Sequence, residues 1–407
     1  MNSTKNKTEP KRAIYILCRD FHENSGSYAG MFEEFAKYAS LQGYIVFILS
    51  GRIDTNQRIF EKLSFAEVRR FPISVLRIPG LGMSLDYMLI ALKIRRFLKQ
   101  HPPSKEDIIV ANGRVALGVI GRKYVLRMGQ PAFTFLKNME IGKKDVSSIT
   151  RIARFVHFSI QSILERFCVR NASGFIFSSE ESRMLTVHQY NKRGSYFIPH
   201  SGVNFHKEKN MKREPSKSAY ILFVSAGTER VRKGVPQIER ALPSIFIEYP
   251  DVKLLHIGEK FDWNVPEWCK KRILQVGRVP WNEMNKYYKN SLFMLSCALN
   301  EFIPNTIFEC MSAGTPVLSS DIQGINELIT HKKDGYVYPR GKEKFLAEGM
   351  RFLLEDRLKI KNMGRLAMMR VQSLERGNFN KRVLEFLEGV YSDSQKSSSC
   401  NLFKAQV

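Results

Sequence analysis

The chain has 407 residues, about twice what one hydrophobic core usually organises, so we expect two domains. Hydrophobic residues make up 43% and aromatic residues 11%, which excludes a largely disordered protein. The formal net charge of +25 favours a polyanionic or phosphate-bearing partner, such as nucleic acid, an anionic lipid surface or a phosphorylated substrate.

The excess positive charge is concentrated in the first half, because residues 1–214 hold 35 basic and 18 acidic side chains. No run approaches the ~20 apolar residues that span a bilayer, and the first residues lack the apolar stretch of a signal peptide. We therefore expect a cytoplasmic protein. The six cysteines are scattered without a C-x-x-C pair, which is typical of reduced thiols rather than of a disulfide framework or a zinc site.

Strand and helix patterns alternate along the first half. Short apolar runs predict strands at 13–18, 44–49, 107–110, 174–178 and 196–199. Helical periodicity predicts helices at 31–42, 85–99 and 151–170. This order is typical of βαβ units, and hence of a parallel sheet with right-handed crossovers.

The same pattern restarts after a segment with almost no apolar side chains. Strands are predicted at 220–224, 252–257, 292–296 and 315–319, and helices at 237–249, 281–290, 305–312, 345–354 and 381–391. The chain is thus predicted to form two doubly wound, Rossmann-like α/β domains that face each other across a cleft. The predicted units are a first domain (1–205), a linker (206–218), a second domain (219–375), a helix that packs back toward the first domain (376–391) and a flexible tail (392–407).

The stretch 301–317, EFIPNTIFECMSAGTPV, follows a predicted strand and enters a helix at Pro304 or Asn305. Proline suits the first helical turn, and the free N–H groups at that end form a ready site for an anion. Glu301 precedes the helix and Glu309 lies more than a turn into it. The two carboxylates can therefore meet two parts of one extended ligand, with an anionic group between them.

This Glu-x7-Glu spacing, followed by PNTIFECMSAGTPVL and SSDIQGINELI, resembles the donor site of family 4 of the retaining glycosyltransferases (glycosyl transferases group 1), which have the GT-B fold. The resemblance is strong over 223–339 and extends in layout over 13–203. It implies a metal-independent, retaining, hexosyltransferase-type enzyme without a cofactor. The enzyme would move a sugar from a nucleoside-diphosphate sugar to a hydroxyl of an acceptor bound by the first domain.

The resemblance also implies roles for individual residues of the motif. Glu301 would contact hydroxyls of the donor sugar, and Glu309 would bind the ribose of the nucleotide. The backbone that faces sugar and diphosphate would be that of Ile303, Pro304, Asn305 and Thr306.

Two cations grip the diphosphate in that family, an arginine and a lysine that precedes a glycine. Lys233 and Gly234 match the second, but Gly227 or Thr228 stands where the arginine is expected. Arg230 or Arg232 would then supply the missing charge. A solvated basic turn is the alternative interpretation.

Other positions are implied more loosely. Gly26 lies in a glycine loop that would approach the donor phosphates, and Gly277 with Arg278 would lie near the nucleotide base or form an ordinary turn. On the acceptor side, Asn112 and Arg114 stand where many relatives carry a histidine.

His200 ends the run YFIPH and has either an acceptor-binding or a structural role.

Basic and large apolar residues are mixed at 93–99, 122–127 and 151–170 in the first domain. The last segment predicts a helix that either lies in a membrane interface or packs as a core helix with solvated arginines. The first interpretation favours a lipid-linked acceptor, in cell-envelope polysaccharide or lipopolysaccharide biosynthesis, and a peripheral enzyme on the inner face of the membrane. Nucleic acid is not an expected partner, because no RNA-binding strand, helix-turn-helix or zinc pattern is present.

Two other functions fit the same fold. A nucleotide-sugar epimerase would consume the donor alone. A sugar-nucleotide-binding subunit without catalytic activity would fit the missing arginine and histidine.

Overall fold

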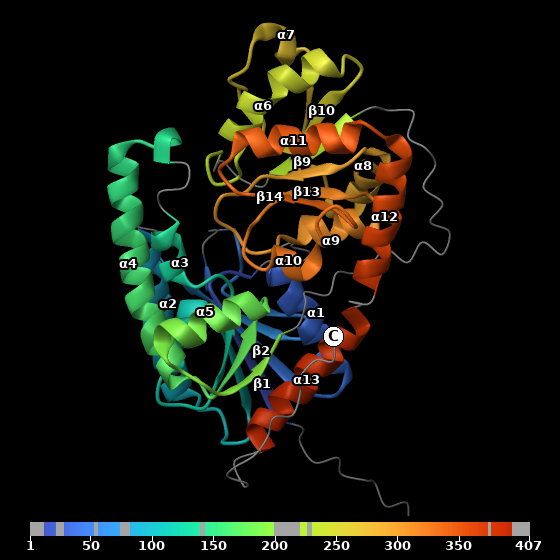
Figure 1. Cartoon of the computed structure of the whole chain (residues 1–407). Helices are drawn as coiled ribbons and strands as arrows, with labels where there is room; N and C mark the ends of the chain where they lie inside the picture. The colour runs from blue at the N-terminus through green and yellow to red at the C-terminus, as the bar shows by residue number, and fades with distance from the viewer. Residues whose placement is uncertain are drawn as a thin grey trace, which may run out of the picture.

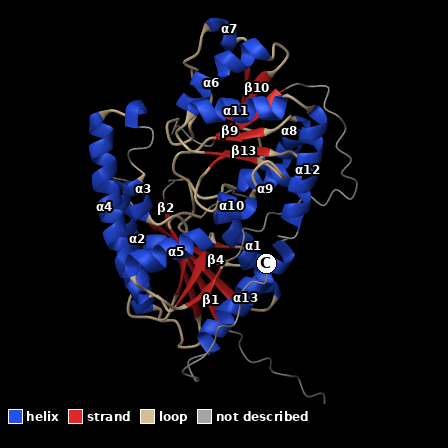
Figure 2. Cartoon of the chain, in the orientation of Figure 1, coloured by secondary structure: helices blue, strands red, loops and turns tan. Residues whose placement is uncertain are grey.

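The computed structural model describes residues 12–21, 28–52, 56–73, 82–138, 143–198, 220–225, 230–372 and 376–392. It contains two α/β domains, one above the other in Figure 1. Figure 2 shows that strands form the centre of each domain and that helices cover them. Gly26, His200, the linker 206–218 and residues 393–407 lie outside the described residues.

The first domain is built on an eight-stranded sheet with the order β3-β4-β2-β1-β5-β6-β7-β8. All neighbours pair in parallel except β3 and β4, which are antiparallel. The strands are β1 (Ala13–Cys18), β2 (Ile45–Arg52), β3 (Phe60–Lys62), β4 (Glu67–Pro72), β5 (Ile108–Asn112), β6 (Val125–Met128), β7 (Gly174–Phe177) and β8 (Ser195–Phe197).

Helices bury both faces of this sheet, which explains why its central strands are continuous apolar runs. The α-helices of this domain are α1 (Tyr28–Leu41), α2 (Gly82–Gln100), α3 (Ala132–Lys137), α4 (Ser148–Asn171) and α5 (Glu180–Tyr190). Two 3₁₀ helices, labelled η, are η1 (Gly113–Val119) and η2 (Lys143–Asp145).

The second domain has a six-stranded, fully parallel sheet with the order β11-β10-β9-β12-β13-β14. Its strands are β9 (Tyr220–Ser225), β10 (Lys253–Gly258), β11 (Ile273–Gly277), β12 (Met294–Ser296), β13 (Val317–Ser320) and β14 (Tyr336–Tyr338). Its helices are α6 (Val235–Glu248), α7 (Glu267–Lys270), η3 (Trp281–Glu283), α8 (Met284–Asn290), α9 (Asn305–Ser312), α10 (Ile325–Leu328), α11 (Glu343–Leu354) and α12 (Arg357–Gln372).

The last helix, α13 (Arg376–Ser392), returns to the first domain. Its apolar residues, including Phe386 and Leu387, belong to the core that also contains β1 and α1. The hydroxyl of Tyr391 accepts the backbone N–H of Ile109 at 2.8 Å. The chain therefore crosses between the domains twice.

The α/β class predicted from the sequence is confirmed, but several elements were not predicted. The basic segment 122–127 contains β6, whose Val125 and Leu126 are fully buried in the middle of the sheet. This segment is thus a core strand and not a basic surface cluster. The short strands β3, β4, β11 and β14 and the helix α12 were also missed, since their apolar patterns are short or mixed with charge.

The two sheets present the carboxyl ends of their strands to each other. The carboxylate of Glu327, in α10, accepts the N–H groups of Glu180 and Glu181 at the start of α5, both at 2.9 Å. In return the carboxylate of Glu181 accepts the N–H of Gly324 at 2.6 Å. Each domain therefore caps a helix of the other, at the sheet edges where α/β proteins bind ligands.

A candidate donor site at the carboxyl edge of the second sheet

The Glu-x7-Glu segment is placed by β12 and α9. The chain leaves β12, passes Glu301 and enters α9 after Pro304, whose extended backbone (φ −73°, ψ 148°) ends the loop. Ile307 and Phe308 bury one side of the helix in the core. Glu301 thus lies in front of the helix, and Glu309 lies on its partly exposed side.

Glu301 is held by two cations from the loop before α6. The Nζ of Lys233 lies 2.8 and 2.9 Å from its two carboxylate oxygens, and a guanidinium nitrogen of Arg232 lies 3.3 Å from one of them. The side chains of Glu301 and Lys233 are only 16% and 14% exposed. Lys233 and Arg232 carry two positive charges and Glu301 carries one negative charge, so the group has a net positive charge. Because the group is partly shielded from water, this charge attracts an anion more strongly than it would in bulk solvent.

Gly234 explains how this loop comes so close to the backbone that follows β12. Its φ of 75° is one that glycine adopts without strain, and a Cβ there would lie 1.9 Å from the carbonyl oxygen of Cys297. The N–H of Leu299 also donates to the carbonyl of Arg232 at 2.8 Å. The loop that carries the cations is therefore fastened to the chain segment that carries Glu301.

The structure distinguishes the two arginines that were candidates for the second cation. Arg230 pairs with Glu239 and lies over the ring of Phe261, 4.8 Å from its centroid. Arg232 is the one beside Glu301.

Glu309 is held at both oxygens by aromatic side chains that sequence reasoning missed. The indole N–H of Trp281 donates to Oε1 at 3.2 Å, and the hydroxyl of Tyr288 donates to Oε2 at 2.8 Å. Tyr288 is buried, which raises its pKa well above the ordinary value, so it remains a donor. Trp281 opens η3 and Tyr288 lies in α8, which follows directly, so the helix predicted at 281–290 was the available signal that both belong to one segment.

The remaining residues that were predicted on the donor side are less confined. Gly277 ends β11 with φ 92°, and the Arg278 side chain is 77% exposed and pairs with Glu259 at 2.8 Å. Ile303 is buried in the core, whereas Pro304, Asn305 and Thr306 are half-buried.

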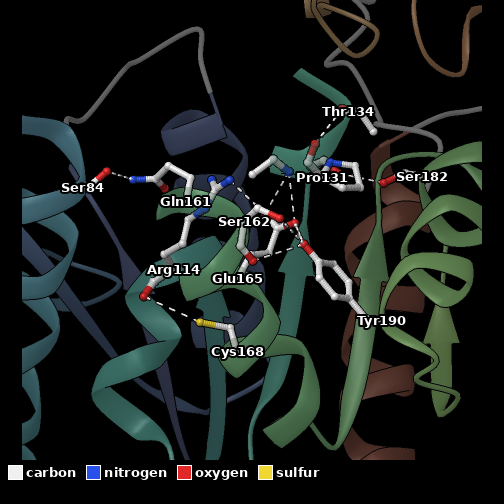
Figure 3. Close-up of polar contacts among 12 residues, drawn as sticks. Ser84, Arg114, Pro131, Thr134, Gln161, Ser162, Glu165, Cys168, Ser182 and Tyr190 are labelled. Carbon is white, nitrogen blue, oxygen red and sulfur yellow. Dashed lines mark hydrogen bonds and ion pairs between the residues drawn. The ribbon is translucent and has the colours of Figure 1, made fainter. Parts of the chain in front are cut away.

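The residues of the first domain that were predicted on the acceptor side, Asn112 and Arg114, have partners within that domain. The side-chain oxygen of Asn112 accepts from Arg127 at 3.0 Å. The guanidinium of Arg114 pairs with the buried Glu165 at 2.9 Å (Figure 3). These contacts fix the ends of β5 and η1.

Figure 3 shows the buried polar network around Glu165. Its carboxylate accepts the N–H of Ala132 at the start of α3 and the hydroxyl of Tyr190 in α5, at 3.1 and 2.9 Å. Burial raises the pKa of Glu165, and the positive charge of Arg114 opposes that shift. The network joins η1, α3, α4 and α5, so in this structure Arg114 helps to hold the first domain together.

Within the described part of the chain, no group of three or more His, Cys, Asp or Glu side chains is arranged to hold a metal ion. The five described cysteines are buried and none of them forms a disulfide with another.

Residues 204–368 match the family model described as glycosyl transferases group 1. This part of the chain is therefore similar to glycosyl transferases group 1. The match spans the cation loop before α6 and all of the Glu-x7-Glu segment, so every predicted donor-side residue except Gly26 lies within the matched residues.

Curated relatives cover different shares of the chain. It is 24% identical over 288 residues to spore coat protein SA of Bacillus subtilis, covering 67% of this chain and 73% of that protein. It is 30% identical over 144 residues to the uncharacterized glycosyltransferase MJ1607 of Methanocaldococcus jannaschii, covering 33% of this chain and 36% of that protein. Together with the family-model match, these relatives support glycosyl transfer.

The fold of the whole chain is found in solved glycosyltransferases. Sucrose-phosphate synthase from Thermosynechococcus elongatus superposes with a TM-score of 0.73 at 16% identity, covering 94% of this chain and all of that one. The protein thus has the GT-B architecture of two Rossmann-like domains, as the resemblance implied.

Proposed function

We propose that the protein is a retaining, metal-independent glycosyltransferase of family 4 that moves a sugar from a nucleoside-diphosphate sugar to an acceptor hydroxyl. The observation that carries this proposal is the contact of Glu301 with Lys233 and Arg232 in front of α9. It combines a carboxylate for sugar hydroxyls, net positive charge for a diphosphate, and the N–H groups at the start of a helix. Glu309, on the next turns of α9, is then the acceptor for the ribose hydroxyls.

The barrier of such a transfer lies in separating positive charge at the anomeric carbon from negative charge on the departing diphosphate. Lys233, Arg232 and the amides near Asn305 stabilise that negative charge as it develops, which is the largest contribution such a site can make. The acceptor oxygen bonds to the anomeric carbon on the face that the diphosphate leaves. The acceptor's proton passes to the departing phosphate oxygen, and the configuration is retained. Glu301 holds the sugar and makes no covalent bond to it.

For the acceptor we propose a glycan or lipid-linked glycan of the cell envelope, met at the inner face of the membrane. The basic excess of the first half of the sequence supports an acceptor associated with anionic lipids or phosphates.

The proposal is tested first by screening nucleoside diphosphates and their sugars for thermal stabilisation, because a ligand of the folded form raises its melting temperature. With the best donor, Glu309→Ala is expected to weaken nucleotide binding, whereas Lys233→Ala mainly slows transfer to an acceptor panel. Glu355→Ala and Lys361→Ala, at exposed positions, are the matched controls. Negligible effects of both site variants would contradict the assignment.

The same assay separates the other two functions. Isomerised sugar formed from donor alone would identify an epimerase. Tight nucleotide binding without any turnover would identify a binding subunit.

A further inference from the structure

The outward face of α4 carries apolar side chains that no described residue covers. Six of them are between 37% and 80% exposed: Ile149, Ile152, Phe155, Val156, Ile163 and Phe167. Their spacing of mainly three and four residues places them in one stripe along the helix. The opposite side of α4 buries Gln161, Glu165, Cys168 and Val169 against the domain. The helix thus points its stripe of large apolar residues away from the core.

Exposed arginines flank that stripe: Arg151, Arg166 and Arg170. We call these three arginines and the six apolar residues the α4 face. The helix runs along the outer edge of the first domain (Figure 1).

The neighbouring helix α2 adds exposed positive charge. It packs beside α4, where Ser84 accepts a hydrogen bond from Gln161 at 2.8 Å. Its exposed basic residues are Lys93, Arg95, Arg96 and Lys99, beside the exposed Leu92. The only acidic residues of the two helices, Asp86 and Glu165, are both buried. The two helices therefore show the solvent a cationic and apolar surface without a negative charge.

We propose that the α4 face docks on an anionic lipid bilayer. The apolar stripe enters the boundary between headgroups and acyl chains, while the arginines keep their charges at the level of the lipid phosphates. No helix among the described residues is both long and apolar enough to cross a bilayer, so α4 lies in the plane of the surface. A protein partner would need acidic groups to match these arginines, whereas an anionic bilayer presents them everywhere. This proposal concerns a surface separate from the donor site.

The test is flotation of the full chain with vesicles of phosphatidylcholine containing 0% or 50% phosphatidylglycerol, at low and high salt. We expect binding to the anionic vesicles. The variant R151Q/R166Q/R170Q should bind them about 100-fold more weakly, from about a fivefold loss per basic residue near the surface. The variant I152S/F155S/I163S should bind at least about tenfold more weakly than the wild type at both low and high salt, because its arginines remain but its apolar stripe is lost.

The matched control is I247S/L358S, which removes two equally exposed apolar side chains from the second domain and should bind like the wild type. Melting temperatures of all variants confirm folding, and thermal stabilisation by nucleoside diphosphates, which depends on the other domain, should be unchanged. Failure of the wild type to float with anionic vesicles at low salt would overturn the proposal, as would variants that float normally. A concentration-dependent dimer that the α4 variants abolish, with no vesicle binding, would show that a second copy covers this face instead.

Discussion

Tyr288→Phe tests whether the aromatic residues around Glu309 position it for a nucleotide. The substitution removes only the hydroxyl that donates to Oε2 of Glu309 at 2.8 Å. The ring of Tyr288 stays in the core between β9 and α9, and the hydroxyls of Ser291 and Thr315 donate to its backbone carbonyl, which the change leaves in place. We therefore expect the fold to persist.

The magnitude follows from the kind of bond that is lost. A hydrogen bond to a charged group contributes about 1.5–3 kcal/mol, but Glu309 is partly exposed, so water compensates part of the loss in the free protein. In the complex the ribose excludes that water. If Glu309 binds ribose, about 1.4 kcal/mol should be lost on binding, a roughly tenfold rise in the nucleotide Kd.

The assay is calorimetric titration with the nucleoside diphosphate that stabilises the wild type most, and with its 2′,3′-dideoxy analogue. The loss should be confined to the ribose compound, because only its hydroxyls can reach Glu309. Tyr287→Phe, one residue earlier in α8, is the matched control and should leave both affinities unchanged. Equal weakening of both ligands, or an unchanged Kd for the ribose compound, would refute the positioning of Glu309 by Tyr288.

Three further predictions concern stability. Gly234→Ala should lower the free energy of unfolding by about 2 kcal/mol or more in urea titrations, because its Cβ would collide with the carbonyl of Cys297. Glu165→Ala should cost about 3–5 kcal/mol by the same measurement, since it leaves Arg114 without its buried partner; an unchanged midpoint would contradict the role of the network. Burial lowers the pKa of His256 below the value of about 6.5 that it has in the unfolded chain, so the unfolded state binds more protons than the folded state as the pH falls. The free energy of unfolding of the wild type should therefore decrease between pH 7.5 and pH 5.5. In His256→Gln, which has no imidazole, this decrease should be smaller.

Local patterns in the sequence were sufficient to predict the fold class and the positions of the two glutamates relative to α9. The alternation of apolar runs and helical periodicity depends on neighbouring residues, so it predicted α9 at 305–312 and placed Glu301 before it and Glu309 within it. Partners far apart in sequence could not be predicted in this way. The contact of Lys233 with Glu301 exists because the sheet places β9 beside β12, and the segments after these strands then meet at one edge.

Tertiary structure also decided which charges are available. From sequence, Arg232 was a candidate for the diphosphate and Arg114 a candidate on the acceptor side. Packing of α4 against η1 brings Glu165 to Arg114 and uses its charge inside the first domain, whereas the turn before α6 leaves Arg232 beside Glu301. The periodicity of α4 showed an amphipathic helix, but only its packing showed that the apolar stripe faces outward, because a helical pattern does not state which face the rest of the chain covers.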